Sequence, residues 1–482
     1  MGDEEAGGSM KARGQGLLAL AVAGVVALGA ISLDRLGPQE PAAPRAGTAT
    51  SGTWLCPHGG GKAYEATVYL ANPGETDVDA RVTELGSKGP AASSRVVVPA
   101  GAQIPVSVDA SDRASSTFVE TFGGWVAAGW VVRGAEGEVG IGAEPCAASA
   151  GRAWVSAAAT TDEGEDTFLV VMNPFDTDAV FDVALFTTDR APVRDSKLTD
   201  VTLRSRRSTA IRLNDFAQGE AALGLSIELS SGRLAASTLM VSESRGIAGV
   251  LADQEPADRH LLLTSSGVGR SVLSVVIPTV PPAAGEATTP SPGQLGSTFT
   301  ATLRSKDQPV PAGGITEQSQ EAGSAVVYPV ATVSSSAVDL AVGDGAAVAA
   351  ALRTIGVGND GGATTGSTAP ASSWVVTPTV VGQPARPGLL VLNPGRSRAT
   401  VEITSLPSDG EGAAETTSIS VPPGRVAGVP REFLDGIGVA SLVLVSDGEP
   451  VVALGASTSL GNEGLSVFGL AAGVPIPDAE TP

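Results

Sequence analysis

Few residues in this 482-residue chain could act as a catalytic base or as a transition-metal ligand. The sequence contains two histidines, His58 and His260, and two cysteines, Cys56 and Cys146. Catalysis by a Ser-His-Asp or Cys-His arrangement needs a base beside the nucleophile, and the two histidines lie far apart in the chain. Two Cys with two His also form a poor zinc ligand set. The sequence therefore predicts no enzyme: no catalytic residue, no metal site and no cofactor.

Two glycine-rich segments match functional motifs by their letters alone. Gly356–Gly361 has the spacing of a dinucleotide-binding fingerprint, but the residues after it do not predict the helix whose N-terminus would meet a pyrophosphate. His58–Gly61 resembles the oxyanion loop of esterases, yet the chain has no Gly-x-Ser-x-Gly nucleophile elbow. We interpret both segments as turns or connections.

Two charged clusters are the remaining candidates for chemistry. The segment Asp162–Asp166 holds four carboxylates within five residues, which could act as an acid–base pair or bind Ca²⁺, although the spacing of an EF-hand and its distal Glu are missing. The segment Arg204–Arg207 holds three arginines that could contact an anionic wall polymer. We favour the simpler interpretations, a solvated loop and a charged strand edge that discourages aggregation.

The balance of charge bears on the class of partner. The chain has 30 basic and 51 acidic residues, which gives a net charge of −21. Nucleic acids and anionic polymers are bound by basic surfaces that neutralise their charge. The sequence therefore predicts no nucleic-acid partner.

Three near-copies of one segment organise the chain. They are ATVYLANP at Ala66–Pro73, TFLVVMNP at Thr167–Pro174 and PGLLVLNP at Pro387–Pro394. A tryptophan precedes the asparagine by 18 residues in the first copy and by 19 in the other two. The structural repeat markers are thus Trp54, Asn72, Pro73, Trp154, Asn173, Pro174, Trp374, Asn393 and Pro394.

The Asn-Pro pair has a physical reading. Proline has no N–H and cannot continue a central strand, whereas an asparagine side chain readily bonds to nearby backbone in a turn. The pair should therefore end one strand and begin the loop to the next. A second reading, in which the three loops form a common binding edge, stays open.

The elements between these markers are short apolar strands, because Val and Thr alternate with Gly, Pro and Asp clusters. The predicted fold is all-β, with tandem β-sandwich modules of the immunoglobulin-like type. The alternative is a β-propeller in which each module of about 100 residues makes two four-stranded blades, although no strand that would join the two ends of such a ring is evident. The boundaries are 52–149 for module 1, 150–257 for module 2, 258–355 for a degenerate module 3, 356–371 for a flexible linker, 372–475 for module 4 and 476–482 for a tail.

An N-terminal transmembrane helix is expected before these modules. The apolar run Leu17–Leu33 would extend about 25 Å as a helix, near the minimum for a bilayer core. Basic residues precede it, which places residues 1–13 in the cytoplasm as a stub and the bulk of the chain outside. We predict a signal anchor at 14–33 and a linker at 34–51. A cleaved signal peptide, which would make the protein secreted, is the alternative.

The cysteines and the remaining tryptophans complete the prediction. An even pair of cysteines in an exported chain is typical of a disulfide, here Cys56 with Cys146, which would close module 1 from end to end. Trp125 and Trp130 occur in module 1 alone, and their odd interval would place them on opposite strand faces. One exposed ring could then stack on sugar rings as a possible binding residue.

The Trp-led segments, the strand running into Asn-Pro and the Val-Pro-x-Gly turns at Val98–Gly101 and Val421–Gly424 resemble an uncharacterised family of actinobacterial envelope proteins, membrane-anchored or secreted, with repeated β-domains. The resemblance implies a short anchor in the cell membrane and extracellular β-domains, and it implies no activity. We expect a non-enzymatic, single-pass envelope protein that acts as a structural spacer or protein-interaction scaffold. The alternative is a module that binds cell-wall glycan or a surface protein.

Overall fold

The computed structural model describes most of the chain after residue 50. The residues described are 51–134, 140–188, 191–242, 246–253, 255–264, 269–278, 296–307, 309–311, 315–332, 335–355, 361–380, 386–408, 412–461 and 464–477. The predicted stub, membrane anchor and nearly all of the first linker lie outside these ranges. Within them, no helix is both long enough and apolar enough to cross a membrane.

Module 1 folds into two four-stranded antiparallel sheets that the chain visits alternately. One sheet has the order β1-β6-β3-β4 and the other has the order β5-β2-β7-β8. Buried and exposed residues alternate along β3, which is typical of a strand with one face on a core. The strands are β1 Ser51–Cys56, β2 Tyr64–Asn72, β3 Val78–Gly86, β4 Gly89–Val98, β5 Ala102–Val108, β6 Ser116–Phe122, β7 Ala127–Gly134 and β8 Ile141–Pro145.

Module 2 repeats this strand order as β9-β14-β11-β12 and β13-β10-β15-β16. Its strands are β9 Ala153–Ala159, β10 Glu165–Asn173, β11 Ala179–Phe186, β12 Val201–Leu203, β13 Arg207–Arg212, β14 Leu223–Ser231, β15 Ala235–Ser242 and β16 Gly246–Leu251. The 3₁₀ turn η1 (Ser196–Leu198) precedes β12 and buries Leu198.

Module 3 has the same organisation although its sequence markers are degenerate. Its sheets are β17-β23-β19-β20, with β21 also on β19, and β22-β18-β24-β25. Its strands are β17 Arg259–Thr264, β18 Gly269–Ile277, β19 Ser297–Arg304, β20 Val310–Pro311, β21 Gln318–Gln320, β22 Ser324–Thr332, β23 Ser336–Gly345, β24 Ala349–Ile355 and β25 Gly361–Thr364. We expected a flexible linker at 356–371, but β25 lies within it and pairs with β24.

Module 4 completes the series with sheets β29-β28-β31-β26-β34 and β30-β27-β32-β33. Its elements are β26 Ser373–Val376, β27 Arg386–Asn393, β28 Ala399–Leu406, β29 Thr416–Val421, β30 Arg425–Gly428, α2 Arg431–Ile437, β31 Ser441–Asp447, β32 Val452–Gly461, β33 Gly464–Ala472 and β34 Val474–Pro475. The described part of the chain is therefore all-β apart from one α-helix and short 3₁₀ turns.

Successive modules pack sheet against sheet within the unit Ala46–Pro482. Strand β13 of module 2 contacts β3 of module 1, β24 of module 3 contacts β9 of module 2, and β32 of module 4 contacts β17 of module 3. Apolar clusters accordingly combine residues of neighbouring modules. Each of these three boundaries is therefore crossed by an apolar cluster.

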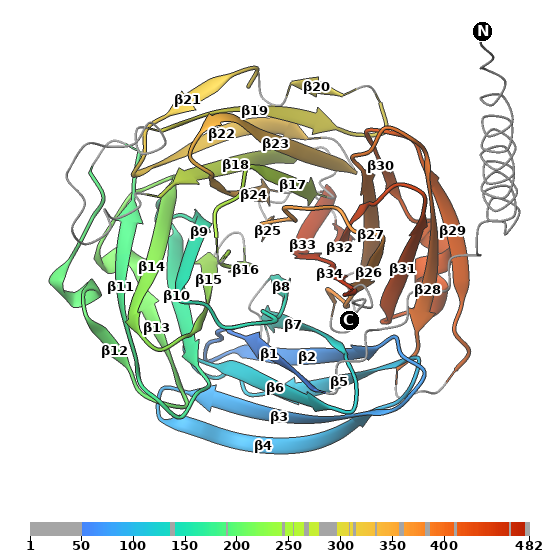
Figure 1. The fold of residues 1–482 in the computed structure, drawn as a ribbon, viewed down its shortest axis with the longest axis horizontal. Coiled ribbons are helices and arrows are strands. Elements are labelled where there is room, and N and C mark those ends of the chain that lie inside the picture. The colour runs from blue at the N-terminus through green and yellow to red at the C-terminus, as the bar shows by residue number, and fades with distance from the viewer. Residues whose placement is uncertain are drawn as a thin grey trace, which may run out of the picture. The chain divides into compact units, whose positions relative to one another are not determined.

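The last strand of each module meets its counterparts at the centre of the four modules (Figure 1). Strand β8 contacts β16 and β33, and β25 contacts the same two strands. These strands are rich in Gly and Ala, which lets backbones approach closely. At Gly249 in β16, for example, a Cβ atom would lie only 2.2 Å from the Trp130 ring of module 1.

Module 4 also contacts module 1, so the series of modules closes on itself. Gln103 in β5 forms a parallel β-bridge with Ser408 of module 4, and the Tyr69 hydroxyl donates to the Val380 carbonyl at 3.0 Å. Among the described residues, closure therefore does not use a strand shared between the two ends. It uses side chains and one isolated bridge, which a search of the sequence for a closing strand could not detect.

Candidate functional site

The three Asn-Pro markers have one structural role. The side chains of Asn72, Asn173 and Asn393 are fully buried. In each, Nδ2 donates at 2.8 Å to the carbonyl four residues later, and Oδ1 accepts from the backbone N–H two residues later at 2.9–3.1 Å. A second Nδ2 bond reaches the end of the fourth strand of the same module. Each asparagine therefore fastens two loops together and offers no atom to a ligand.

The tryptophans that lead the modules are also structural. Trp154 and Trp374 are buried, and the indole N–H of each donates at 2.9 Å to the carbonyl just before the seventh strand of its module, at Leu234 and Val451. Module 3 makes the same bond with a different residue. His260 donates through Nε2–H to the Val348 carbonyl at 2.8 Å. His260 therefore stands where the other modules have tryptophan, and burial lowers its pKa.

The sequence prediction for Trp125 and Trp130 needs correction. Trp130 is only 1% exposed and packs against Gly249 of module 2, so its ring cannot stack on a sugar from solvent. Trp125 is half-buried and packs edge-on against Trp54, with ring centroids 6.1 Å apart. Face alternation was a poor guide here, because Trp125 lies before β7 begins and β7 is contacted by β16 of module 2 as well as by β1 of its own module.

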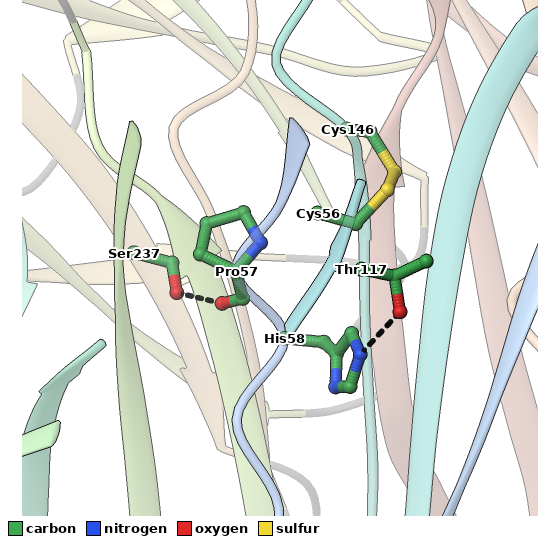
Figure 2. The surroundings of a disulfide bond; sticks show 6 residues. All are labelled: Cys56, Pro57, His58, Thr117, Cys146 and Ser237. Carbon is green, nitrogen blue, oxygen red and sulfur yellow. Dashed lines mark hydrogen bonds between the residues drawn. A yellow bond between two sulfur atoms is a disulfide. The ribbon is translucent and has the colours of Figure 1, made fainter. Parts of the chain in front are cut away.

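The predicted disulfide between Cys56 and Cys146 is confirmed, with a Cα–Cα distance of 4.5 Å (Figure 2). It joins the end of β1 to the residue after β8, so it ties together the two sheets of module 1. The next residue, Pro57, accepts a hydrogen bond through its carbonyl from the Ser237 hydroxyl of module 2. The disulfide therefore lies at the boundary between modules 1 and 2.

His58 follows the disulfide and is fully buried (Figure 2). Its Nδ1–H donates to the Gly59 carbonyl at 2.7 Å, which leaves Nε2 to accept from the Thr117 hydroxyl at 3.0 Å. Burial lowers the pKa of His58 to about 4, against the weaker opposing effects of the Gly59 carbonyl and Asp109. Both ring nitrogens are occupied, so the imidazole acts as a neutral structural link and not as a general base.

The glycines after His58 do not form an oxyanion loop. The N–H of Gly59 donates to the Ser115 carbonyl at 2.8 Å, and the N–H of Gly61 donates to the Ala110 carbonyl at 2.7 Å. A Cβ at Gly60 would lie 2.1 Å from that same Ala110 oxygen. The glycines therefore serve close backbone packing. In the other glycine motif, Gly361 begins β25, a strand and not a helix.

Two acidic side chains near the centre escaped the sequence analysis. Glu144 in β8 is 1% exposed and faces Trp130 across the β7–β8 pair. Asp253 follows β16 and is partly exposed, but its Oδ2 atom is buried. Neither Asp253 Oδ2 nor Glu144 Oε1 has a hydrogen-bond partner among the described residues. Burial raises the pKa of Asp253 to about 8, and burial together with Asp253 raises that of Glu144 well above its usual range. The sequence feature that could have identified Glu144 is the presence of a glutamate within the otherwise apolar strand IGAEP.

The acidic segment Asp162–Asp166 lines a cleft of about 620 Å³ at the boundary between modules 1 and 2. Across the cleft, the guanidinium of Arg113 stacks between two rings, 5.1 Å from the centroid of Tyr64 and 4.9 Å from that of Phe168. Asn214 fixes the base of the acidic segment, because it donates to the Glu165 carbonyl at 2.7 Å and accepts from the Thr167 N–H at 3.0 Å. The cleft is therefore polar, with aromatic surface at one wall.

The four carboxylates of this segment point to different partners. Asp162 accepts from the N–H of Glu163 at 2.9 Å, Glu165 is buried, and Asp166 pairs with Arg212 at 2.6 Å. Among the residues that the structure describes, no three His, Cys, Asp or Glu side chains come together as a metal ligand set. The segment thus presents polar groups to the cleft without a converging cation site.

The basic segment Arg204–Arg207 lies beside module 1. Arg206 and the module 1 residues Arg81 and Pro90–Ser93 line a second depression, of about 290 Å³. Arg207 donates to the Ser87 carbonyl at 3.3 Å. The segment is therefore part of the boundary between two modules as well as a charged surface.

Comparison with known proteins gives one family. The model described as "Family of unknown function (DUF5719)" matches residues 120–361, from β6 of module 1 to the start of β25 in module 3. No curated protein matches the chain. Since the family match covers just over half of the 482 residues, the protein belongs to DUF5719, a family of unknown function.

Proposed function

We propose that this protein is a non-enzymatic scaffold of the cell envelope, held at the membrane by its N-terminal segment, with its β-modules outside the cytoplasm. The observation that carries the proposal is the closure of modules 1 and 4 through Gln103, which joins four modules into one body. Such a body can present several loops and strand edges at fixed positions. The residues most suited to chemistry, His58 and His260, are used for internal hydrogen bonds.

The extracytoplasmic location is supported by the Cys56–Cys146 disulfide, because disulfides persist in oxidising compartments. For the fold, we propose that the eight sheets form a β-propeller of eight blades, two from each module, of which six have four strands and two have a fifth, β21 or β34. The cyclic contacts of β8, β16, β25 and β33 support this alternative over separate immunoglobulin-like sandwiches.

Protease protection of intact cells tests the location. With the protein tagged after Pro482, external protease should remove the modules, and thiol labelling before and after reduction should show Cys56 and Cys146 blocked in the cell. A protected chain with free thiols would contradict the proposal. Cross-linking in intact cells, followed by purification through the tag, should then recover envelope proteins in fixed ratio to the scaffold.

Binding of wall glycan at the Asp162–Asp166 cleft is a second candidate. The specific observation is the polar lining of the cleft beside the Tyr64 ring, since sugars are held by hydrogen bonds and aromatic faces. Sedimentation with purified wall glycan tests it. Asp162→Asn should reduce sedimentation with the glycan more than Tyr64→Phe does, because only the first substitution removes a carboxylate. Equal sedimentation of both variants and the parent at every glycan concentration would exclude this cleft as the glycan-binding site.

A further inference from the structure

The edge strand β4 differs from its counterparts in the other modules. It spans ten residues at the edge of its sheet, and the side chains of residues 90–95 are all exposed. The equivalent strands are β12 with three residues, β20 with two and β29 with six. Figure 1 shows these four strands at the periphery of the modules. Among the described strands, β4 is the longest such edge.

The edge strands β5 and β22 carry a device that β4 lacks. Strand β5 has Pro105 in its interior, and β22 has Pro329. Proline removes a backbone donor and prevents a further strand from pairing, which is how natural proteins protect open edges. In β4 the single proline, Pro90, is the second residue, and a register shift between Thr83 and Leu85 of β3 interrupts the pairing at Ala91 and Ala92, so Ser93–Val98 is the stretch with an uninterrupted set of backbone donors and acceptors. Val97 in this stretch is 52% exposed.

The charges beside this edge select the kind of strand that would fit. Glu120, Arg81 and Arg95 lie opposite one another on β6, β3 and β4, so they form one row across the sheet. Glu120 pairs with Arg81 at 2.5 Å, which leaves Arg95 at the edge with a cation as its neighbour. Like charges directly opposite are unfavourable in a sheet, and opposite charges are favourable. The next position in the row would therefore favour a carboxylate.

Arg206 adds a second cation where the backbone prefers glycine. Its φ is 51°, in the left-handed region, and the equivalent turn residues in modules 1 and 4 are Gly101 and Gly424 with φ of 65° and 68°. A non-glycine residue in this conformation is strained, because its Cβ comes too close to the following carbonyl oxygen. Arg206 lines the depression beside Pro90–Ser93. Arg206 pairs with Asp176 at 3.2 Å, and both side chains are exposed, so the guanidinium stays accessible to a second carboxylate.

We propose that the edge of β4 binds an extended acidic segment of a partner protein, which pairs with Ser93–Val98 as an added strand. The segment places one carboxylate opposite Arg95 and another near Arg206. Main-chain hydrogen bonds supply affinity and the alternating acidic side chains supply specificity. Although the chain is acidic as a whole, charges are screened within about 8 Å at physiological salt, so the local cations dominate. This inference rests on the proposed scaffold function and names its partner class.

The probe is a labelled ten-residue peptide that alternates valine and glutamate, tested on the full chain by fluorescence anisotropy. The first matched peptide has lysine in place of glutamate, and the second has N-methyl groups on alternate amides. Both should bind at least tenfold more weakly, and hydrogen exchange should show new protection of those amides of Ser93–Val98 that point away from β3. Equal binding of the three peptides would overturn the proposal.

Arg206→Gly separates binding from folding, because it should leave stability unchanged or higher while it weakens binding of the acidic peptide at least threefold. Arg95→Glu should weaken binding of the acidic peptide at least tenfold. Arg398→Glu, an exposed arginine beside the β29 edge that bonds to Ser420, is the matched control and should bind normally. If Arg95→Glu binds as the parent does, or if ultracentrifugation shows that the edge is instead occupied by a second copy of the chain, the proposal is wrong.

Failure of this inference is distinguishable from failure of the scaffold proposal. Envelope partners that are cross-linked equally well to the parent and to Arg95→Glu would overturn the β4 site and support the scaffold. Specific peptide binding in a protein that has no cross-linked partner outside the cytoplasm would support the β4 site and overturn the scaffold.

Discussion

The side chain of Gln103 binds Ser441 across the boundary between the first and last modules. Its Oε1 accepts from the Ser441 N–H at 2.8 Å and from the Ser441 hydroxyl at 2.7 Å, while its Nε2 donates to the Val439 carbonyl at 2.8 Å and to the Ser408 hydroxyl at 2.9 Å. This buried amide therefore uses both of its N–H donors and both lone pairs of its oxygen. One residue thus makes four of the bonds that close the series of modules.

Gln103→Ala should lower the free energy of unfolding by about 2–4 kcal/mol, because it leaves several buried groups of module 4 without partners. Hydrogen exchange should rise first at the amide of Ser441. Gln320→Ala is the control, since Gln320 bonds only within module 3, to Val275 and Ser324; it should destabilise without faster exchange at Ser441. Unchanged exchange at Ser441 in Gln103→Ala would contradict this role.

Replacing both Cys56 and Cys146 with serine should cost about 2–5 kcal/mol, because the disulfide restricts a 90-residue loop of the unfolded chain. Urea unfolding of the parent and the double variant measures the difference. Both cysteines are buried, so a reductant without denaturant should act slowly on the parent. A urea midpoint that is equal in the two proteins would show that the bond adds no stability.

Asn173→Ala should destabilise the protein by about 2–3 kcal/mol, because two loops lose their shared partner. Asn173→Asp should be at least as harmful at pH 7, since a carboxylate would face the Thr177 carbonyl, and it should recover in part near pH 4 when the acid can donate. Thr177→Ala keeps that carbonyl and should change stability by less than about 0.5 kcal/mol. Equal effects of Asn173→Ala and Thr177→Ala would remove the loop-fastening role.

Stability should fall on both sides of an intermediate pH. The pKa of His58 is lowered to about 4 from 6.5, so the unfolded chain binds the proton first, and this contribution to stability is lost as pH falls from about 6.5 towards 4. The pKa of Asp253 is raised to about 8 from 3.8, so its contribution is lost as pH rises from about 4 towards 8. Asp253→Asn should therefore flatten the alkaline side of the urea-midpoint profile and exceed the parent at pH 8. Parallel profiles for the two proteins would refute the assignment.

The sequence was a good guide to features that depend on local geometry. The distance from Trp154 or Trp374 to its asparagine is fixed by a strand, a turn and a second strand, so the spacing persists where the backbone persists. The same reasoning failed for His260, because imidazole and indole differ in size and appearance while each places one N–H on an equivalent carbonyl. Only the hydrogen bond to Val348 reveals the correspondence.

Features that depend on contacts between modules were beyond such reasoning. Strands β8 and β25 are short and rich in Gly and Ala, so they carry little hydrophobic periodicity. The strands that they contact across the centre lie more than 80 residues away in sequence. Gly142 in β8 and Gly249 in β16 are one such pair. Closure through Gln103 is a property of one side chain. Trp130 is buried by a sheet of module 2, and nothing in the sequence of module 1 indicates this contact.

The position of the disulfide has a mechanical consequence. Force applied at Ser51 would peel β1 as far as Cys56 and then pass directly through the sulfur atoms to Cys146, so the residues between them would carry no load. Reduction would release those 90 residues, roughly 300 Å of extra contour length at about 3.5 Å per residue. Under tension, the later modules of the oxidised protein would thus unfold first, and module 1 would resist unfolding at the end where the force is applied.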